Sequence, residues 1–485
     1  MMGLKGQLRV TCDFFNLHTF LKRRIQLEIS MKKVAFLISI IKKNLNKIGI
    51  DGAIFYASLA RGFQGISGFV SLFFVVKYLT NVEQGFYYTF ASVLAIQVFF
   101  ELGLSGIITQ YAAHEMVGLN WTNGRLQGEE KNLSRLSSLL RFCVKWYAIA
   151  AVFLFIILQI IGYQFFQKFG KHPDIIWKMP WTILVFSTSI SLFINPILSF
   201  IQGLGLVKSI EKIRFILQLA NSMILWTLLV FGAKLYASAI CSVITLIVLT
   251  ITIIVKFRST LIPIWKQFGS FNIDFKKEIF PYQWKIALSW ISGYFIFQLF
   301  NPVLFATEGA TVAGQMGITL AVLNGILTLS ISWVTTKVPM FSGLIAGENF
   351  TTLDNAFKKI TLQSTIINFL GVAFFLFMVI GFRFSGLSYG NRFLPFVPLF
   401  CMSVAIIINH IVGSLAIYLR CHKKEPFLIF SIVTGILCSL STLILGKKFG
   451  VTGMTSGYLA IVICTSFWAF QIFQNKRVEW HGKPM

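Results

Sequence analysis

The chain has 485 residues, of which 56% are hydrophobic and 12% are charged. Ordinary soluble domains are roughly 45–50% hydrophobic and about 25% charged. The apolar residues also gather into runs near the ~20 residues that cross about 30 Å of hydrocarbon. These features exclude a soluble enzyme or binding domain and predict an all-α integral membrane protein.

The net charge of +26 would indicate nucleic-acid binding in a soluble protein. Here the Lys and Arg residues lie in short segments between apolar runs, where they set orientation and contact anionic lipid headgroups. We therefore expect membrane lipids, and no nucleic acid, as partners. The seven cysteines have no metal-ligand spacing, so we expect most of them to be small core residues.

Apolar runs bounded by charged residues, Pro or Gly predict about twelve transmembrane helices. In chain order, the first six are expected at 52–79, 84–110, 142–167, 179–201, 213–232 and 235–255. A basic loop follows at 258–280. The second six are expected at 281–306, 312–336, 360–382, 396–419, 427–446 and 450–473. This spacing predicts two six-helix lobes, at 51–257 and 281–474, and a tail at 475–485.

The distribution of Lys and Arg predicts the orientation of the helices. With both termini on one side, 33 of the 43 basic residues fall on that side and 9 on the other. Positive residues near helix ends favour the cytoplasm, so we expect both termini there.

The first 50 residues carry ten basic groups and no run of membrane length. We interpret residues 1–50 as a basic cytoplasmic segment whose part from Met31 onward lies in the membrane interface. Met31, followed by Lys32 and Lys33, also resembles a natural start. We therefore suspect that residues 1–30 are an upstream start-site artefact.

The two sets of six helices are weakly similar to each other. At an offset of 229 residues the matching pairs are Gly85 and Gly314, Leu94 and Leu323, and Gly118 and Gly347. The offset falls to 220 at two amphipathic segments, LSRLSSLLR from Leu133 and LDNAFKKIT from Leu353, and to 217 at Ala233 and Gly450. Two copies of six helices predict a parallel repeat around an axis along the membrane normal.

Two charged residues are expected deep in the membrane. Arg61 lies ~13 Å into the first helix from the cytoplasmic side, and Glu101 lies at a similar depth in the second helix. They could form a structural ion pair. Alternatively, Arg61 could offer its planar guanidinium to a phosphate. Glu101 is a candidate for ion coupling, because intramembrane carboxylates mark ion pathways.

Other polar side chains inside predicted helices are expected mainly to bond neighbouring helices. They are Gln97, Asn195, Gln298, Asn301, Asn324, Asn409 and His410. Of these, Gln298 and Asn324 are further substrate-binding candidates. His410 could carry a proton near neutral pH, although a histidine satisfied by a helix contact is the favoured interpretation.

The sequence contains no phosphate-binding GxxxxGK[ST] motif, no HExxH motif and no paired-carboxylate constellation. All five aspartates lie in tails, loops or at a helix entrance. We therefore predict no catalytic residue, no metal site and no cofactor.

Twelve helices in two parallel lobes resemble the multidrug/oligosaccharidyl-lipid/polysaccharide exporter superfamily, and within it the polysaccharide flippases. The resemblance covers about residues 50–475. It rests on RGFQGISGF (61–69), YLTNVEQGFYYTFASVLAIQVFFELGLSGIITQYAAHE from Tyr78, and VPMFSGLIAGE from Val338.

The resemblance implies a MATE-like fold and a bacterial inner-membrane transporter. Such a protein would move undecaprenyl-pyrophosphate-linked oligosaccharide, for O-antigen, capsule or exopolysaccharide synthesis, to the periplasmic leaflet by alternating access. It implies a cavity lined by the first, second, seventh and eighth helices, with Arg61 as its cation. A monomer, with or without polysaccharide polymerase machinery beside it, is the expected assembly.

Two alternatives stay open from the sequence. A multidrug/cation antiporter of the same superfamily would need mid-membrane carboxylates, and Glu101 is the single one well inside the predicted helices. An O-antigen polymerase or membrane glycosyltransferase would need a large extracytoplasmic loop. The longest outside loops predicted here have about a dozen residues.

Overall fold

The computed structural model describes residues 52–122, 125–267, 269, 271–422 and 424–481. The basic segment expected at 1–50, with Met31, lies outside the described residues, as does the end of the tail at 482–485.

The first half of the chain forms a helical bundle that we call the N-lobe. Its helices are α2 (Gly52–Tyr78), α3 (Asn81–Leu94), α4 (Val98–Glu101), α5 (Leu104–Glu115), α6 (Glu130–Phe169), α7 (Lys178–Ile201), α8 (Val207–Val230) and α9 (Tyr236–Lys266). Three short turns connect some of them: the 3-10 turns η1 (Ala95–Gln97) and η2 (Met116–Gly118) and the π-helical turn η3 (Gln202–Leu206). The antiparallel hairpin of β1 (Leu119–Thr122) and β2 (Arg125–Gly128) is a feature that the all-α prediction lacked.

The second half forms the C-lobe, which begins after a π-helical turn, η4 (Phe275–Ile279). Its helices are α10 (Phe280–Phe297), α11 (Phe300–Thr307), α12 (Ala310–Thr335), α13 (Val338–Ala346), α14 (Phe350–Phe384), α15 (Phe396–Cys421) and α16 (Leu428–His481). A 3-10 turn, η5 (Ser388–Arg392), precedes α15.

The described helices account for the predicted number of membrane spans. Nine helical stretches are long and apolar enough to cross a membrane, and the bent pair Asn81–Glu101 and Leu104–Gly118 makes a tenth. Two of these stretches, Lys178–Val230 and Leu428–His481, contain 53 and 54 residues. At ~1.5 Å per residue each is about 80 Å long, more than twice the hydrocarbon thickness.

Each long stretch contains a glycine with positive φ, Gly205 at 85° and Gly450 at 62°, where the chain leaves the helical conformation. Glycine adopts this backbone readily because it has no Cβ. Beyond Gly450 the chain folds back, since a Cβ on Gly457 would lie 2.4 Å from Leu445 Cδ1. Each stretch is therefore a pair of spans, which gives the expected twelve.

Several predicted boundaries differ from those of the structure. The helix expected at 84–110 is broken after α4, where Leu102 and Gly103 have φ of 50° and 68°. The helix expected at 281–306 is interrupted between α10 and α11. Pro302 explains this break, because its ring clashes with the carbonyl four residues earlier, at Gln298. The two amphipathic segments continue directly into α6 and α14 instead of forming separate elements.

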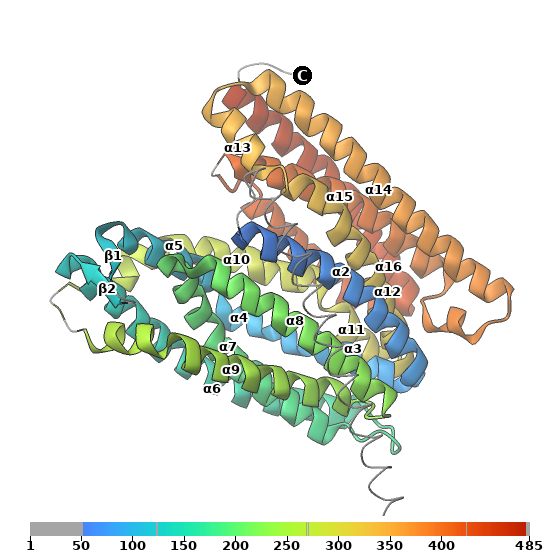
Figure 1. Ribbon diagram of the computed structural model, residues 1–485. Helices are drawn as coiled ribbons and strands as arrows, with labels where there is room; N and C mark the ends of the chain where they lie inside the picture. Colours follow the sequence, from blue (N-terminus) through green and yellow to red (C-terminus); the bar gives the residue numbers. More distant parts are fainter. Residues whose placement is uncertain (1–51, 123–124, 268, 270, 423, 482–485) are drawn as a thin grey trace, which may run out of the picture.

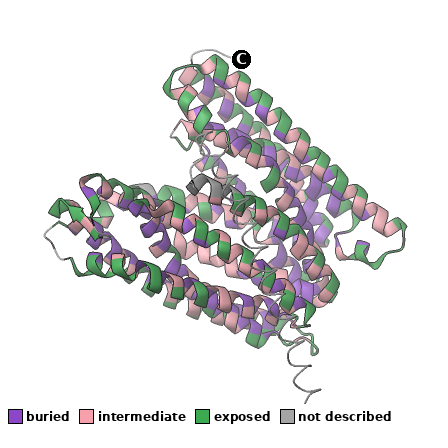
Figure 2. Cartoon of the chain, in the orientation of Figure 1, coloured by how far each residue is buried: buried purple, intermediate pink, exposed green. Residues whose placement is uncertain are grey.

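Figure 1 shows the two lobes meeting near α3, α11 and α12 and diverging at their other ends. The diverging ends carry the β1–β2 hairpin in the N-lobe and α13 in the C-lobe, and they belong to the side rich in Lys and Arg. Buried residues gather at the joined end (Figure 2). One hydrophobic cluster there contains residues of both lobes, including Phe86, Phe305 and Met316.

The joined end depends on a close backbone contact between α3 and α12. A Cβ on Gly85 would lie 1.9 Å from the Ala310 carbonyl oxygen, and one on Gly314 would lie 2.8 Å from the Gly85 nitrogen. Small residues permit such an approach between membrane helices. Gly85 and Gly314 are the pair that the repeat offset of 229 matches, and Tyr88, which lies against Gly317, obeys the same offset.

Equivalent residues of two copies meet where a symmetry axis passes between them. The facing glycines therefore place the repeat axis between α3 and α12. Gln84 adds a polar contact beside them, because its side-chain amide donates to the Gly314 carbonyl at 2.8 Å.

We predict that Gly85→Ala loosens the joined end, because the added methyl cannot fit against Ala310 without moving α12. The expected cost is about 1–3 kcal/mol of stability, with faster hydrogen exchange across 81–93 and 310–323. Gly62→Ala on α2 is the matched control, since no atom lies within 4 Å of its added Cβ. Equal exchange in the two variants would contradict the contact.

Candidate functional site

One face of α2 points at the C-lobe. A Cβ on Gly65 would lie 2.8 Å from Leu329 Cδ2, and one on Gly325 would lie 3.6 Å from the Phe69 ring. Residues three and four apart share a helix face. The stripe that faces α12 therefore runs from Arg61 through Gly65, Phe69 and Phe73 to Val76, with Arg61 nearest the diverging ends of the lobes.

Beyond Gly65 this stripe forms one wall of an apolar groove between the lobes. The groove has a volume of about 650 Å³, and its other walls come from α12, α14 and the loop at 387–393. Its α14 side includes Phe374, Phe375, Met378 and Phe382. The hydroxyls of Ser330 and Tyr389 are the few polar groups among its lining residues. The groove therefore suits a hydrocarbon chain or another apolar body.

Arg61 lies on the same face of α2 as the groove-lining residues, nearer the diverging ends of the lobes. Its side chain is exposed. It forms no ion pair with any described residue, including Glu101. The structure thus does not form the structural ion pair that the sequence left open. The reason is positional, because α2 packs on α8 and α12, whereas Glu101 belongs to α4, which packs on α6 and α10.

Glu101 is instead held by its own lobe. Its carboxylate accepts a hydrogen bond from the Ser105 hydroxyl at 2.9 Å, and its backbone carbonyl accepts one from Tyr147 of α6 at 3.2 Å. It is the last residue before the helix break at Leu102. Broken helices near the bilayer midplane are common at transporter binding sites, so the geometry keeps Glu101 a candidate for ion coupling.

The other two candidates lie away from the groove lining. Gln298 is half-buried at the break between α10 and α11. Asn324 is exposed on α12, two turns beyond Gly317 and on the same face, which places it where α12 separates from α3. The structure therefore brings Arg61 and Asn324 to the border of the opening but does not join Gln298 to them.

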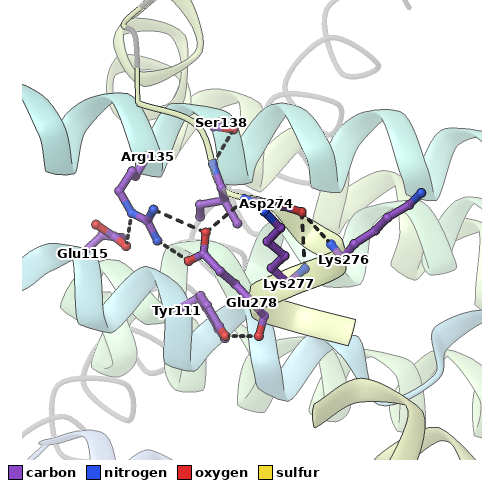
Figure 3. Close-up of polar contacts among 9 residues, drawn as sticks. Tyr111, Glu115, Arg135, Ser138, Asp274, Lys276, Lys277 and Glu278 are labelled. Carbon is purple, nitrogen blue, oxygen red and sulfur yellow. Dashed lines mark hydrogen bonds and ion pairs between the residues drawn. The ribbon is translucent and has the colours of Figure 1, made fainter. Parts of the chain in front are cut away.

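A polar network at the diverging end of the N-lobe was not predicted (Figure 3). Arg135 of α6 pairs with Glu115 of α5 at 2.8 Å and with Glu278 of η4 at 2.5 Å. The Tyr111 hydroxyl donates to the Glu278 carbonyl at 2.5 Å. Since Glu278 lies in the η4 turn just before α10, this network fixes the linker between the lobes to the N-lobe. The hydrogen bond from Arg135 lowers the pKa of the Glu278 carboxyl below its ordinary value.

The C-lobe has a counterpart at the same place. Asp354, near the start of α14, accepts hydrogen bonds from Arg477 Nε at 2.8 Å and from the Tyr418 hydroxyl at 2.5 Å. Asp354 matches Ser134 at the repeat offset of 220, and Ser134 donates to the Phe271 carbonyl at 2.7 Å. In both lobes, therefore, the first turns of the third span fix the segment that follows the sixth span.

Two observations bear on chemistry. Within the described residues, no group of three or more His, Cys, Asp and Glu side chains is placed to hold a metal ion. The stretch GLSYG (386–390) does fit the G-x-S-x-G pattern of hydrolases. It lies in and beside the η5 turn rather than at the strand-to-helix turn that the hydrolase motif requires.

We predict that Arg135→Met lowers the free energy of unfolding by about 2 kcal/mol, because it leaves the buried Glu115 carboxylate without its cation. The variant should also lose a pH dependence. A depressed Glu278 pKa stabilises the fold above the unfolded-state value of about 4.5, and that stability is lost as the pH falls through the lower folded-state value.

Denaturant unfolding in micelles, from pH 7 to about pH 3, measures both effects. Lys131→Met is the control, since Lys131 is exposed on the first turn of α6. Wild-type stability and an unchanged pH profile in Arg135→Met would show that the network contributes nothing.

No protein-family model matches the sequence, and no curated protein matches it. Solved structures do match in fold. A multidrug resistance MATE family transporter of the MOP superfamily, in an inward-facing conformation, matches with a TM-score of 0.63 at 14% identity, over 88% of this chain and 95% of that one. The MATE multidrug transporter DinF-BH in complex with R6G matches with 0.53 at 12% identity, over 89% and 96%.

The lipid II flippase MurJ, in an inward closed conformation, matches with a TM-score of 0.51 at 12% identity, over 87% of this chain and 90% of that one. At these identities the likeness concerns the fold alone. The protein therefore shares its fold both with MATE multidrug transporters and with a lipid flippase.

Proposed function

We propose that this protein is a membrane transporter that flips a pyrophosphate-linked lipid carrying an oligosaccharide, in the class of undecaprenyl-pyrophosphate-linked repeat units. Movement would run from the cytoplasmic to the periplasmic leaflet of a bacterial inner membrane, in the synthesis of a surface polysaccharide. The fold shared with MATE transporters and the MurJ flippase supports transport. The choice of a lipid-linked substrate rests on the face of α2 that borders the C-lobe.

This face of α2 is charged at one end and apolar along the rest, and so matches a lipid with a charged headgroup. Arg61 offers a guanidinium without an ion-pair partner among the described residues, and Phe69, two turns away, begins the apolar groove of about 650 Å³. Eight residues of helix separate the two positions by ~12 Å. A guanidinium suits a pyrophosphate, and an apolar groove suits a prenyl chain. One helix face thus provides for both ends of the lipid carrier.

The lobes support alternating access around this face. They touch at the ends of α3 and α12 and diverge on the side rich in Lys and Arg, which the positive-inside rule assigns to the cytoplasm. The conformation is then inward-facing, with Arg61 reachable from the cytoplasmic leaflet and both termini in the cytoplasm. Flipping requires the α3–α12 contact to open while the other ends close. The internal repeat supplies both halves of the cavity, so a monomer suffices.

A multidrug/cation antiporter is the second candidate, because Glu101 lies at a helix break and two of the matching structures are multidrug transporters. The exposed guanidinium of Arg61 disfavours this function, since it would repel an organic cation from the same opening.

The direct test compares bacteria with the gene, without it, and with the gene restored, and it scores which leaflet holds the lipid-linked oligosaccharide. Accumulation in the cytoplasmic leaflet on deletion alone is expected. Normal outward transfer without the gene, in a strain with no redundant transporter, would overturn the flippase. Loss of dye efflux together with normal transfer would favour the antiporter.

We predict that Arg61→Gln lowers flipping of undecaprenyl-pyrophosphate-linked N-acetylglucosamine in vesicles by roughly tenfold or more, because charged hydrogen bonds contribute about 1.5–3 kcal/mol. Arg61→Lys should retain part of the rate, since it keeps the charge and loses the planar fork. Lys77→Gln, at the other end of α2 and exposed, is the control. Equal rates in Arg61→Gln and Lys77→Gln would remove Arg61 from the substrate path.

We predict that filling the groove hinders the same reaction. Met378→Trp places an indole in the groove, and excluding two methylenes of a prenyl chain, at ~0.8 kcal/mol each, weakens binding by roughly tenfold. Phe377→Trp is the control, because Phe377 is the adjacent α14 residue, is 77% exposed and lies outside the groove. Identical flipping by the two tryptophan variants would show that the groove does not hold the chain.

A further inference from the structure

A buried histidine lies in the C-lobe behind the wall of the groove. His410 is near the middle of α15 and is fully buried. Its Nε2 atom is 2.6 Å from the Ser364 hydroxyl oxygen, and its Nδ1 atom is 3.4 Å from the Thr365 hydroxyl oxygen. Both hydroxyls belong to α14. An ionisable group at this depth is rare unless it has a function.

The hydrogen bonds around His410 determine which tautomer its imidazole ring adopts. The Ser364 hydroxyl is also 2.6 Å from the Ser330 carbonyl oxygen, which can only accept. The Ser364 hydroxyl must therefore donate its single hydrogen to the Ser330 carbonyl. His410 Nε2 must then carry a hydrogen and donate it to the Ser364 oxygen. The ring is then the neutral Nε2–H tautomer.

The same count leaves Nδ1 without a donor. The Thr365 hydroxyl gives its proton to the Thr361 carbonyl at 2.8 Å, so it can only accept from the ring. The neutral form thus places a nitrogen lone pair against an oxygen lone pair. A proton on Nδ1 would convert this contact into a hydrogen bond, and both ring nitrogens would then donate to hydroxyl oxygens.

The described contacts of the His410 ring include no charged residue. The packing helices α12 and α13 contain no titratable residue. On α14, Lys358 and Lys359 are exposed, one to two turns nearer the basic side, with Asp354 beyond them. On α16, Tyr458 accepts from Asn409 at 2.9 Å. The other titratable groups in the membrane parts of α15 and α16 are Tyr418, Cys401, Cys438 and Cys464.

Two hydrogen bonds connect His410 to the groove, one between His410 and Ser364 and one from Ser364 to Ser330. Ser330, whose carbonyl receives the Ser364 proton, lines the groove on α12. Asn368 of α14 donates to the Ser330 hydroxyl at 3.3 Å, and its buried side-chain oxygen has no partner among the described residues. A change in the charge of His410 therefore reaches the groove wall within one network.

We propose that His410 is a proton-binding site that couples proton movement to the lobe rearrangement of this transporter. Nδ1 takes a proton from water reaching it from one side and releases it to the other, and no covalent bond between heavy atoms forms or breaks. This inference rests on the proposed function for its role in transport, whereas the proton site itself stands on the contacts above.

The first test observes the proton without transport. Solid-state NMR of the full chain in lipid bilayers, labelled with ¹⁵N-histidine, follows the two ring nitrogens from pH 8 to about pH 5, the interval in which histidines titrate. His410→Gln identifies the signal by its loss. We expect the Nε2–H tautomer at high pH and a doubly protonated ring at low pH. A ring that stays neutral throughout overturns the proposal.

Two further variants separate this site from a packing role. Thr365→Val keeps the ring and removes the acceptor that a protonated Nδ1 needs, so it should shift the titration of His410 to lower pH. His114→Gln is the matched control, because His114 is exposed on α5 and has no part in the network. An unshifted titration in Thr365→Val would contradict the assignment of Nδ1.

The last test uses vesicles with a pH gradient and undecaprenyl-pyrophosphate-linked N-acetylglucosamine as the probe. The gradient should raise flipping by about fivefold or more in wild type and His114→Gln, and should have no effect in His410→Gln. Flipping that responds to the gradient without His410 overturns this proposal and leaves the flippase intact. A titrating His410 in a protein that flips nothing overturns the flippase and leaves the proton site.

Discussion

The architecture depends on how closely α3 and α12 approach each other. With Gly85 facing Ala310 and Gly314, the two backbones are in direct contact, and the aromatic and aliphatic residues around them form a core shared by both lobes. Helices in lipid associate through packing rather than through hydrophobic expulsion from water. A contact without side chains gives dense packing over a small area, which can hold one conformation and still be separated when the lobes rearrange.

The diverging ends lack the backbone contact that joins α3 to α12 and need a further restraint within each lobe. Each lobe solves this with a polar cluster at the start of its third span: Arg135 with Glu115 and Glu278 in one, Asp354 with Arg477 and Tyr418 in the other. These clusters stiffen each lobe internally and do not cross between lobes. Lobes that are stiffened in this way and joined at one end suit a rocking mechanism.

Much of the fold could be predicted, because the relevant signals are local or repeated. Span positions follow from apolar length, and the repeat matched Gly85 with Gly314, although the sequence did not indicate that these two residues meet. The site was predicted less well. Arg61 was found as a lone cation in an apolar helix, but its proposed partner Glu101 required knowing which helices are neighbours. The pairing of Arg135 with Glu278 spans 143 residues and leaves no local pattern.

The groove and His410 could likewise be predicted from the sequence to different extents. No single segment of the sequence indicates the groove, because α2, α12 and α14 each contribute an apolar stripe that would equally suit lipid contact. His410 was visible as an ionisable residue in an apolar helix, and its interpretation as a satisfied helix contact is correct for Nε2. The unsatisfied Nδ1 emerges only when the protons of Ser364 and Thr365 are counted in three dimensions.

Ser330 then gives the two proposals a common physical element. It lines the groove that would hold the lipid, and its carbonyl and hydroxyl take part in the network that reaches His410. Coupling between two ligands is reciprocal, so a proton that alters the groove must itself be bound differently when the groove is filled. Through Ser330, occupancy of the groove by a prenyl chain would change the proton affinity of His410 by the same factor.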